Sequence, residues 1–349
     1  MSQSSDAPPR LIALYLPQFH PIPENDAWWG KGFTEWTNVA KARPLFRGHY
    51  QPHVPADLGF YDLRVPETRQ AQADLARQYG IGAFCYYHNW FAGKQLLERP
   101  FNEVLTSGEP DFPFCLCWAN HSWTGVWHGA PDRILIKQTY PGVEDAIRHF
   151  YSVLPAFHDK RYLRVDGKPM FLVFKPKDLP DSLGFVELWR KLAHENGLPG
   201  LHLVGFTWDR KWDHAADGFD AAVDQHLPRL LGNDKKKSPA HPTIYRYGDV
   251  AQHIVPPITS RHSLYPCVLP NWDNTPRSGA NGLVLHESTP ELFRLQLKKA
   301  LAWSRDKPAE SKVIFIKAWN EWAEGNHLEP DLRNGHGYLQ VIKEELEAY

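Results

Sequence analysis

The chain has 349 residues, a length that a single large barrel domain can reach. Its 39 lysines and arginines nearly balance its 40 aspartates and glutamates, so the net charge of -1 provides no electrostatic attraction to nucleic acid or to an anionic membrane. Hydrophobic residues make up 42% and charged residues 23% of the chain, proportions that exclude global disorder and allow a large core.

The N-terminal segment, residues 1–9, is polar and rich in proline. It lacks the apolar stretch of a signal peptide, and no run in the chain reaches the ~20 apolar residues of a membrane-spanning helix. We therefore expect a disordered N-terminus over 1–9, one domain over 10–349, no membrane span and a cytoplasmic location.

The cysteines lie within apolar, strand-like runs, at Cys85, Cys115, Cys117 and Cys267. No other cysteine or histidine stands at the spacing of a zinc finger. We expect buried, reduced thiols and no structural zinc.

Eight short apolar runs recur along the chain, and each ends in polar or aromatic residues. They cover residues 11–20, 81–90, 113–120, 169–176, 201–209, 219–226, 264–273 and 313–322. Runs that are almost continuously apolar are typical of strands covered on both faces, as in parallel sheets.

Amphipathic, helix-like segments lie between most of these runs, over 67–78, 144–158, 182–195, 290–304 and 337–348. Alternation of strands and helices predicts an α/β fold, a single (β/α)8 TIM barrel. Two connections fit this pattern poorly. Residues 209–218 leave room for barely two helical turns, and we expect 231–243 to form an exposed loop.

The connection after the first strand, residues 21–64, is much longer than an ordinary βα loop. It contains the tryptophan-rich sequence WWGKGFTEWTNV. One interpretation is that this loop folds over the barrel mouth and brings Glu35 and Trp36 to the substrate. The alternative is that Glu35 pairs locally with Lys31 or Arg43.

In such a barrel the active site lies at the carboxyl ends of the strands. The residues there are rich in aromatic rings, amides and imidazoles. Aromatic faces stack on sugar rings and planar polar groups bind hydroxyls in pairs, so we expect an oligosaccharide or polysaccharide substrate. The predicted substrate-binding residues are His20, Glu35, Trp36, Tyr87, His88, Trp118, Asn120, Asp224, Asn271, Trp272, Trp319, Asn320 and Trp322.

The sharpest local signal is the sequence WNEWAEG, residues 319–325. Glu321 and Glu324 are three residues apart, so a helical turn places them on one face. Two neighbouring carboxyl groups beside a sugar, one protonated and one ionised, are what glycoside hydrolysis requires. We predict that Glu321 and Glu324 are catalytic. The alternative is an exposed first helical turn that merely carries two glutamates.

Other chemistries have weaker support in the sequence. His20, His88, His226 and Asp224 could hold a metal, but imidazoles at a barrel mouth more often bind hydroxyls, so we expect no metal and no cofactor. The sequence contains no nucleophile elbow, no dinucleotide-binding glycine motif and no P-loop.

Several long motifs carry a family resemblance. They are YLPQFHPIPENDAWWGKGFTEWTNV, HYQPHVPADLGFYDLR, GIGAFCYYHNWF, LLERP, FPFCLCWAN and WNEWAEGNHLEP. They resemble the WbsX-like polysaccharide-biosynthesis proteins, which are similar to glycoside hydrolase family 99, the endo-α-mannosidases and endo-α-mannanases. The stretch of about 125–310 matches by layout more than by motif.

The resemblance implies a retaining, endo-acting glycoside hydrolase that cleaves an α-linked, mannose-like bacterial surface polysaccharide. It assigns Glu321 as the base that deprotonates the substrate's own 2-hydroxyl, which then attacks the anomeric carbon to form a 1,2-anhydro sugar. It assigns Glu324 as the acid and base that protonates the leaving oxygen and then activates water. Ala323 stands where family 99 enzymes carry histidine. The residues alone do not distinguish this mechanism from a covalent one.

Two alternatives remain open at this point. One is a glycosyltransferase or assembly enzyme of O-antigen or capsule biosynthesis. A sugar-nucleotide donor needs cations for its diphosphate, and Lys175 and Arg277 are near the predicted mouth. The other is a carbohydrate-binding barrel without catalytic activity.

Overall fold

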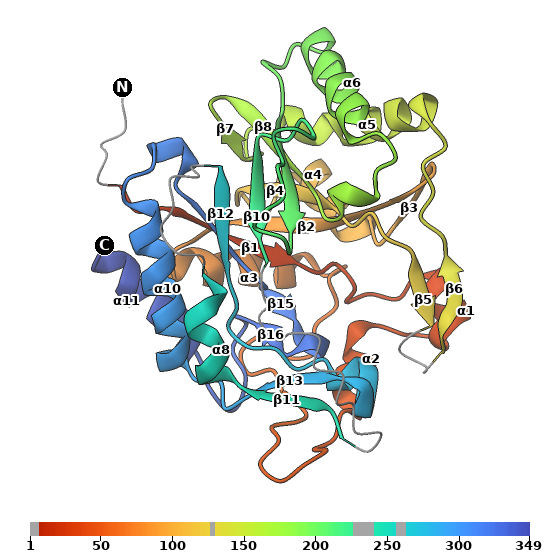
Figure 1. The fold of residues 1–349 in the computed structure, drawn as a ribbon. Helices are drawn as coiled ribbons and strands as arrows, with labels where there is room; N and C mark the ends of the chain where they lie inside the picture. The colour runs from red at the N-terminus through yellow and green to blue at the C-terminus, as the bar shows by residue number, and fades with distance from the viewer. Residues whose placement is uncertain (1–6, 126–129, 226–240, 256–262) are drawn as a thin grey trace.

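The computed structural model describes residues 7–125, 130–225, 241–255 and 263–349. Eight parallel strands form a closed barrel: β1 (Arg10–Tyr15), β2 (Ile81–Phe91), β4 (Phe114–Trp118), β8 (Lys168–Val173), β9 (His202–Thr207), β10 (Ala221–Asp224), β12 (Leu264–Val268) and β14 (Val313–Ile316). β1 closes the barrel by pairing with both β2 and β14, so that Leu11 lies opposite Ile81 and Ile314. The predicted (β/α)8 barrel is confirmed, and each apolar run contains one barrel strand (Figure 1).

The strands are apolar on both faces because their inner side chains fill the barrel and their outer ones pack under the helices. In β1, the side chains from Leu11 to Leu14 have no exposed surface. The four cysteines are buried and free, as predicted.

Helices cover the outside of the barrel: α3 (Pro66–Gln78), α4 (Arg99–Ser107), α5 (Val143–His158), α6 (Ser182–Glu195), α8 (Tyr247–Ile254), α10 (Pro290–Ser304) and α11 (Gly337–Glu347). The five predicted helical segments match α3, α5, α6, α10 and α11 closely. Figure 1 shows α5 and α6 together on one flank and α10 and α11 together on another. None of the helices within the described ranges combines the length and the apolar character needed to cross a bilayer.

Helix starts follow local sequence signals. The Asp181 side chain accepts a hydrogen bond from the Gly184 N–H at the start of α6, and Thr289 does the same for Leu292 ahead of Pro290 in α10. The short connection over 209–218 forms turns rather than a helix. Residues 231–240 of the predicted loop 231–243 lie outside the described residues. So do residues 1–6 of the predicted disordered N-terminus 1–9.

Further short elements build the ends of the barrel. The segment after β1 carries α1 (Pro23–Trp29) and α2 (Glu35–Lys41), and the segment after β12 carries α9 (Thr275–Ser278) and η3 (Gly279–Asn281). The remaining ones are β3 (Lys94–Leu96), β5 (Trp123–Gly125), β6 (Ala130–Ile136), β7 (Arg164–Val165), η2 (Pro176–Asp178), β11 (Thr243–Arg246), β13 (Leu283–His286), η4 (Ala309–Ser311), β15 (Asn320–Glu321), η5 (Trp322–Glu324) and β16 (Asn326–His327).

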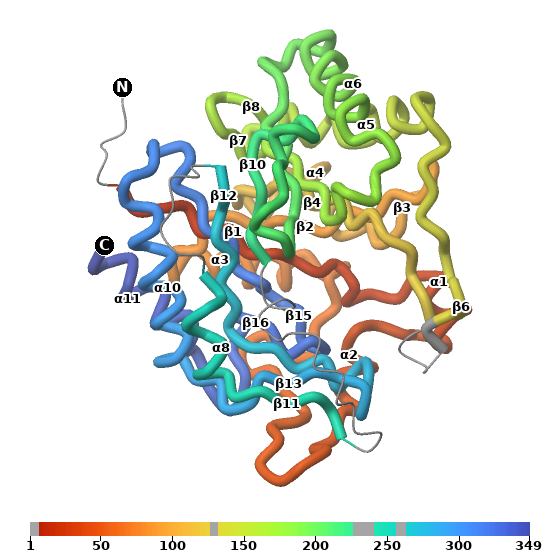
Figure 2. The backbone as a smooth tube through the Cα atoms, in the orientation of Figure 1, coloured from red at the N-terminus to blue at the C-terminus, as the bar shows by residue number. Residues whose placement is uncertain are grey.

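The long segment after β1 lies against the C-terminal part of the chain. Figure 2 shows its red and orange tube beside the blue segment that follows β12 and β14. The Trp36 ring in α2 is 5.4 Å from the Trp322 ring in η5, and α2 also packs against α9. Three segments that are far apart in sequence therefore meet at the carboxyl end of the barrel.

Candidate active site

Glu321 and Glu324 lie on a tight hairpin after β14. β15 and β16 pair antiparallel, with Glu321 opposite Asn326, and the 3-10 turn η5 connects them. The hairpin closes at Gly325, whose φ of +65° favours glycine. A Cβ atom there would lie 2.9 Å from the backbone nitrogen of Asp273, because the Asp273 N–H donates to the Glu324 carbonyl at 2.7 Å.

Arg277 in α9 joins three carboxylates. Its Nε donates to Glu35 Oε1 at 2.7 Å, its Nη1 to Glu324 Oε1 at 2.6 Å and its Nη2 to Glu321 Oε2 at 3.0 Å. The Arg277 side chain is only 10% exposed, so these ion pairs are largely shielded from water. Charge-assisted hydrogen bonds of this kind fix the relative positions of all three glutamates.

Glu35 reaches Arg277 from the start of α2 and is fully buried. Its other oxygen accepts a hydrogen bond from Gln18 Nε2 at 2.9 Å, and its backbone N–H donates to the Gln18 carbonyl. Glu35 therefore anchors Arg277 and is not part of the cavity wall. Its salt-bridge partner is Arg277, which comes from a distant segment, rather than the local Lys31 or Arg43.

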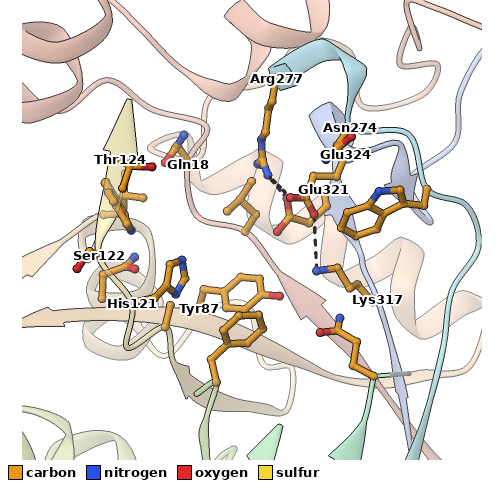
Figure 3. A pocket seen from close by; sticks show the side chains of 18 of the residues that line it. Gln18, Tyr87, His121, Ser122, Thr124, Asn274, Arg277, Lys317, Glu321 and Glu324 are labelled. Carbon is orange, nitrogen blue, oxygen red and sulfur yellow. Dashed lines mark hydrogen bonds and ion pairs between the residues drawn. The ribbon is translucent and has the colours of Figure 1, made fainter. Parts of the chain in front are cut away.

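A second cation, Lys317, approaches Glu324 from the end of β14. Lys317 Nζ is 3.6 Å from Glu324 Oε2 and lies 5.0 Å from the centre of the Trp272 ring. Figure 3 shows Arg277 and Lys317 pointing at the glutamate pair from different sides.

These contacts shift the two pKa values in opposite directions. Burial, together with the charge of Glu324, raises the pKa of Glu321 to about 7. Burial also disfavours the charged form of Glu324, but Arg277 and Lys317 outweigh it and hold the pKa of Glu324 below its ordinary value. Near neutral pH one carboxyl group of the pair can therefore carry a proton while its neighbour is ionised.

The pair faces a cavity of about 570 Å³ at the carboxyl end of the barrel. Its aromatic lining is Trp29, Tyr87, Trp123, Phe174, Trp208 and Trp272. Its polar lining is Gln18, Asn89, His121, Ser122, Thr124, Gln225, Asn274, Arg277, Lys317, Glu321 and Glu324. Burial lowers the pKa of His121 to about 4, so this imidazole is neutral and can either donate or accept a hydrogen bond.

Four of the predicted site residues line this cavity: Tyr87, Trp272, Glu321 and Glu324. The other predicted residues do not line it; they are His20, Glu35, Trp36, His88, Trp118, Asn120, Asp224, Asn271, Trp319, Asn320 and Trp322. Most of these are buried residues that connect the barrel to its loops.

The buried amides connect neighbouring strand ends. Asn120 donates to the Lys175 carbonyl at 2.8 Å and accepts from the Lys175 N–H at 2.7 Å, which ties β4 to β8. Asn320 does the same for Leu16 after β1, at 3.0 and 2.7 Å.

The predicted imidazoles and indoles pack away from the cavity. His88 Nε2 lies 2.9 Å from His149 Nε2 in α5, and the Trp118 ring contacts the same His149. The His20 Nδ1–H donates to the Pro17 carbonyl at 3.0 Å. Trp319 is fully buried in the core.

The residues weighed as a metal site have separate partners. Asp224 accepts a hydrogen bond from Arg210 at 2.7 Å, and burial raises the pKa of Asp224 to about 6. His20 forms a hydrogen bond with the Pro17 carbonyl, and His88 forms one with His149. His226 lies outside the described residues.

The sequence analysis did not select several lining residues, above all Lys317, and it considered Arg277 only as a possible contact for a diphosphate. Lys317 directly follows β14, and this position at the carboxyl end of a strand is the signal that could have identified it, whereas Arg277 stands in α9, beyond the end of β12. His121 and Asn89 are also strand-end residues that face the cavity.

Comparison with known proteins places the chain among bacterial relatives. Two proteins of Xanthomonas campestris pv. campestris, from strains B100 and ATCC 33913, both named Uncharacterized protein WxcX, are 40% identical over 346 residues. The match covers 97% of this chain, and the chain spans about half (50%) of the length of these curated relatives.

Solved structures share the fold. A glycoside hydrolase-like protein superposes with a TM-score of 0.60 at 17% identity, over 99% of this chain and 96% of the other. The family 99 endo-alpha-mannosidase of Bacteroides thetaiotaomicron also gives 0.60, at 13% identity, over 97% of this chain and 98% of the other. In sequence, residues 11–342 match the family described as Glycosyltransferase WbsX. The chain is a member of the WbsX family, with a barrel like that of the family 99 endo-α-mannosidases.

Proposed function

We propose that this chain is a glycoside hydrolase in which Glu321 and Glu324 form the acid–base pair. The observation that supports it is a buried and a partly buried carboxyl group with oppositely shifted pKa values at the wall of an aromatic-lined cavity. Protonation of the leaving oxygen and activation of an attacking hydroxyl both need such a pair.

The proposed substrate is an α-linked, mannose-like bacterial polysaccharide, cleaved within the chain and with retention of configuration. The shared fold of the endo-alpha-mannosidases and the WNEWAEG sequence support this choice. In the proposed mechanism the substrate's 2-hydroxyl attacks the anomeric carbon to form a 1,2-anhydro sugar, which water then opens. The aromatic rings of Tyr87, Trp208 and Trp272 line the cavity, and rings of this kind can stack on sugars.

The direct test is incubation with a panel of bacterial O-antigens, capsules and α-mannans. The proposal expects new reducing ends and a first product of retained anomeric configuration by NMR. Glu324→Gln should lower turnover by roughly 10²–10⁴-fold. Full activity in that variant would contradict the assignment.

The roles within the pair have two possible arrangements. The family resemblance makes Glu324 the proton donor, whereas the pKa values of the free site leave the proton on Glu321. For Glu324 to donate a proton, it must first take one up. This requires that Arg277 and Lys317 move away from the Glu324 carboxylate when substrate binds, because these two cations hold its pKa low.

Leaving-group dependence separates the two arrangements. An aryl glycoside with a good leaving group needs little protonation, so the variant that lacks the acid keeps fast release of the aryl group in the first step, measured in a single turnover, while losing activity on the polysaccharide. If Glu324→Gln shows this pattern, the family roles hold. If Glu321→Gln shows it, the roles are reversed.

A second candidate function is glycosyl transfer, which the description of the family names. Arg277 and Lys317 place two cations at the cavity, as a sugar-nucleotide diphosphate would require. Both already contact glutamates, which favours hydrolysis. Product formed only when sugar nucleotides are supplied would support transfer instead.

A further inference from the structure

A second cavity, of about 40 Å³, lies beside the segment that follows Glu324. Gly325 and His327 from the β15–β16 hairpin line it, together with His53 from the long segment after β1 and Asp331. His53, His327 and Asp331 are not part of the larger cavity's lining. Whatever this group does, it does outside the proposed reaction site.

The three side chains converge on a small volume. His53 Nδ1 lies 2.8 Å from His327 Nε2, and His327 Nε2 lies 4.0 Å from Asp331 Oδ2. One potential ligand atom from each residue lies within 4.8 Å of the others. The exposed fractions are 3% for His53, 7% for His327 and 3% for Asp331, so bulk water does not compete for these atoms.

The hydrogen-bond pattern shows which ring nitrogen of His327 carries the proton and which one has a lone pair. His327 Nδ1 is 2.9 Å from the Glu329 carbonyl, which only accepts, so Nδ1 carries the proton. Nε2 of the neutral His327 ring therefore accepts from the His53 Nδ1–H. A backbone carbonyl that orients a histidine in this way is a common partner of metal-binding imidazoles.

Both imidazoles are neutral at neutral pH. Burial and the neighbouring His327 lower the pKa of His53 to about 4, and burial lowers the pKa of His327. The neutral form is the one that binds metal ions.

Asp331 is oriented by the backbone that follows it. Its Oδ1 accepts hydrogen bonds from the N–H groups of Arg333 and Asn334, whereas Oδ2 has a long contact of 3.4 Å with the Asn334 amide. The Arg333 guanidinium lies 4.6 Å from the centre of the Tyr50 ring, which stacks on His53.

The same cavity contains a further oxygen atom that could bind a metal ion. The buried Asn271 Oδ1 has no hydrogen-bond partner within the part of the chain that the structure describes. A buried polar atom without a partner is costly, so a ligand that this oxygen could contact would stabilise the fold.

We propose that His53 Nδ1, His327 Nε2 and Asp331 Oδ2 bind a divalent transition-metal ion of the zinc type. Two imidazoles and one carboxylate suit zinc, with a fourth position for water or Asn271. The ion takes the place of the proton between the rings, and that proton moves to His53 Nε2, so none is released. Zinc–nitrogen bonds of ~2.0–2.1 Å in a tetrahedral site require the two nitrogens to separate to about 3.3 Å.

The ion would connect the long segment after β1 to the β15–β16 hairpin. His327 pairs with Asn320 in the hairpin, and its ring stacks at 3.7 Å on Trp322, which lies between the two glutamates in sequence. The proposed site is therefore structural, and it differs from the metal-free expectation that considered only the strand-end histidines.

The test is zinc retention by the full chain. Protein stripped with a chelator is loaded with Zn²⁺, desalted, and analysed for zinc content and thermal midpoint. We expect one zinc per chain and a higher midpoint, and Co²⁺ in place of zinc should give the visible absorption of a tetrahedral site. His53→Gln keeps an N–H that can donate to His327, so it should fold, and it should weaken zinc binding at least ~100-fold.

His286→Gln is the matched control, because His286 lines the same cavity and is not one of the three ligands. It should bind zinc like the parent protein. The proposal is overturned if the folded parent retains no zinc, or if His53→Gln retains as much as the parent. Either result would make His53 and His327 a hydrogen-bonded pair only.

Discussion

The guanidinium of Arg277 touches three carboxylates that come from distant parts of the sequence. Its charge, with that of Lys317, decides which member of the glutamate pair is ionised. The WNEWAEG sequence predicts that two carboxyl groups are neighbours, but their relative pKa values depend on these two cations. Side-chain chemistry at this site is therefore set by contacts that no local motif contains.

Glu321 should destabilise the folded protein as pH rises. Its pKa is about 7 in the folded state, above the ordinary 4.5, because burial and Glu324 disfavour its charge. Below about pH 4.5 it is protonated in both states and has no effect, and above that pH only the unfolded state ionises freely. We predict that Glu321→Gln raises the free energy of unfolding at pH 8 by on the order of 2–3 kcal/mol, and by little at pH 4.5.

Urea denaturation at the two pH values measures this difference. Glu195→Gln, an exposed substitution on α6, is the control and should show no comparable difference between pH 4.5 and pH 8. An equal gain at both pH values would mean that packing, rather than ionisation, explains the effect of Glu321→Gln.

At the scale of single elements, strand alternation sorts the residues at the end of β2. Tyr87 and Asn89 face the cavity, whereas His88 and Trp90 face α5, where both rings stack with His149. Successive side chains on a strand point to opposite faces. The sequence analysis selected both Tyr87 and His88, and only a fixed strand register shows which of them points inward.

This division predicts different effects for neighbouring substitutions. Tyr87→Phe should weaken oligosaccharide binding by roughly 2–10-fold with little change in stability, since it removes one hydroxyl at the cavity wall. His88→Ala should lower the free energy of unfolding by about 2–4 kcal/mol, because it opens a cavity and leaves His149 without its partner. Calorimetric titration and urea denaturation measure the two effects, and the reverse pattern would contradict the assigned faces.

The β15–β16 hairpin depends on Gly325 for a second reason besides backbone conformation. Gly325 has a φ of +65°, and a Cβ there would lie 2.9 Å from Asp273. Gly108 has a φ of +78°, and a Cβ there would meet nothing within 4 Å. Gly108→Ala should therefore cost only the conformational term, about 1 kcal/mol, and it is the matched control.

Gly325→Ala should cost at least ~2 kcal/mol more than Gly108→Ala, because it also pushes the hairpin away from Asp273. Turnover should fall as well, since Glu324 directly precedes the shifted residue. Comparing the free energies of unfolding of the two variants tests this. Equal losses of free energy would show that Asp273 can move aside at little cost.

At the scale of the whole molecule, the closed barrel brings the first and last segments of the chain together. β1 lies between β2 and β14, and Asn320 joins the last hairpin to Leu16. Closure places the carboxyl end of every strand around one cavity. The chain spans about half (50%) of the length of its Xanthomonas relatives, so this barrel represents one part of those proteins.

The sequence by itself determined the class of fold, the eight strands and most outer helices. Apolar runs covered on both faces, helix caps and helical periodicity are local properties, and they persist wherever the segment packs. The same local reasoning predicted that Glu321 and Glu324 are neighbours, because they share one short motif, and both line the cavity. It also located the Trp-rich segment after β1, from which Trp29 lines the cavity and Glu35 contacts Arg277.

Only the tertiary structure decided which strand-end residues face the cavity and which support it. His88, Trp118 and Asn120 stand where a site residue should, yet they pack against α5 or connect strand ends. The ion-pair network around Arg277 and the cluster of His53, His327 and Asp331 likewise join residues that are distant in sequence. Strand register, closure and burial determine such contacts, and these arise only when the whole barrel is assembled.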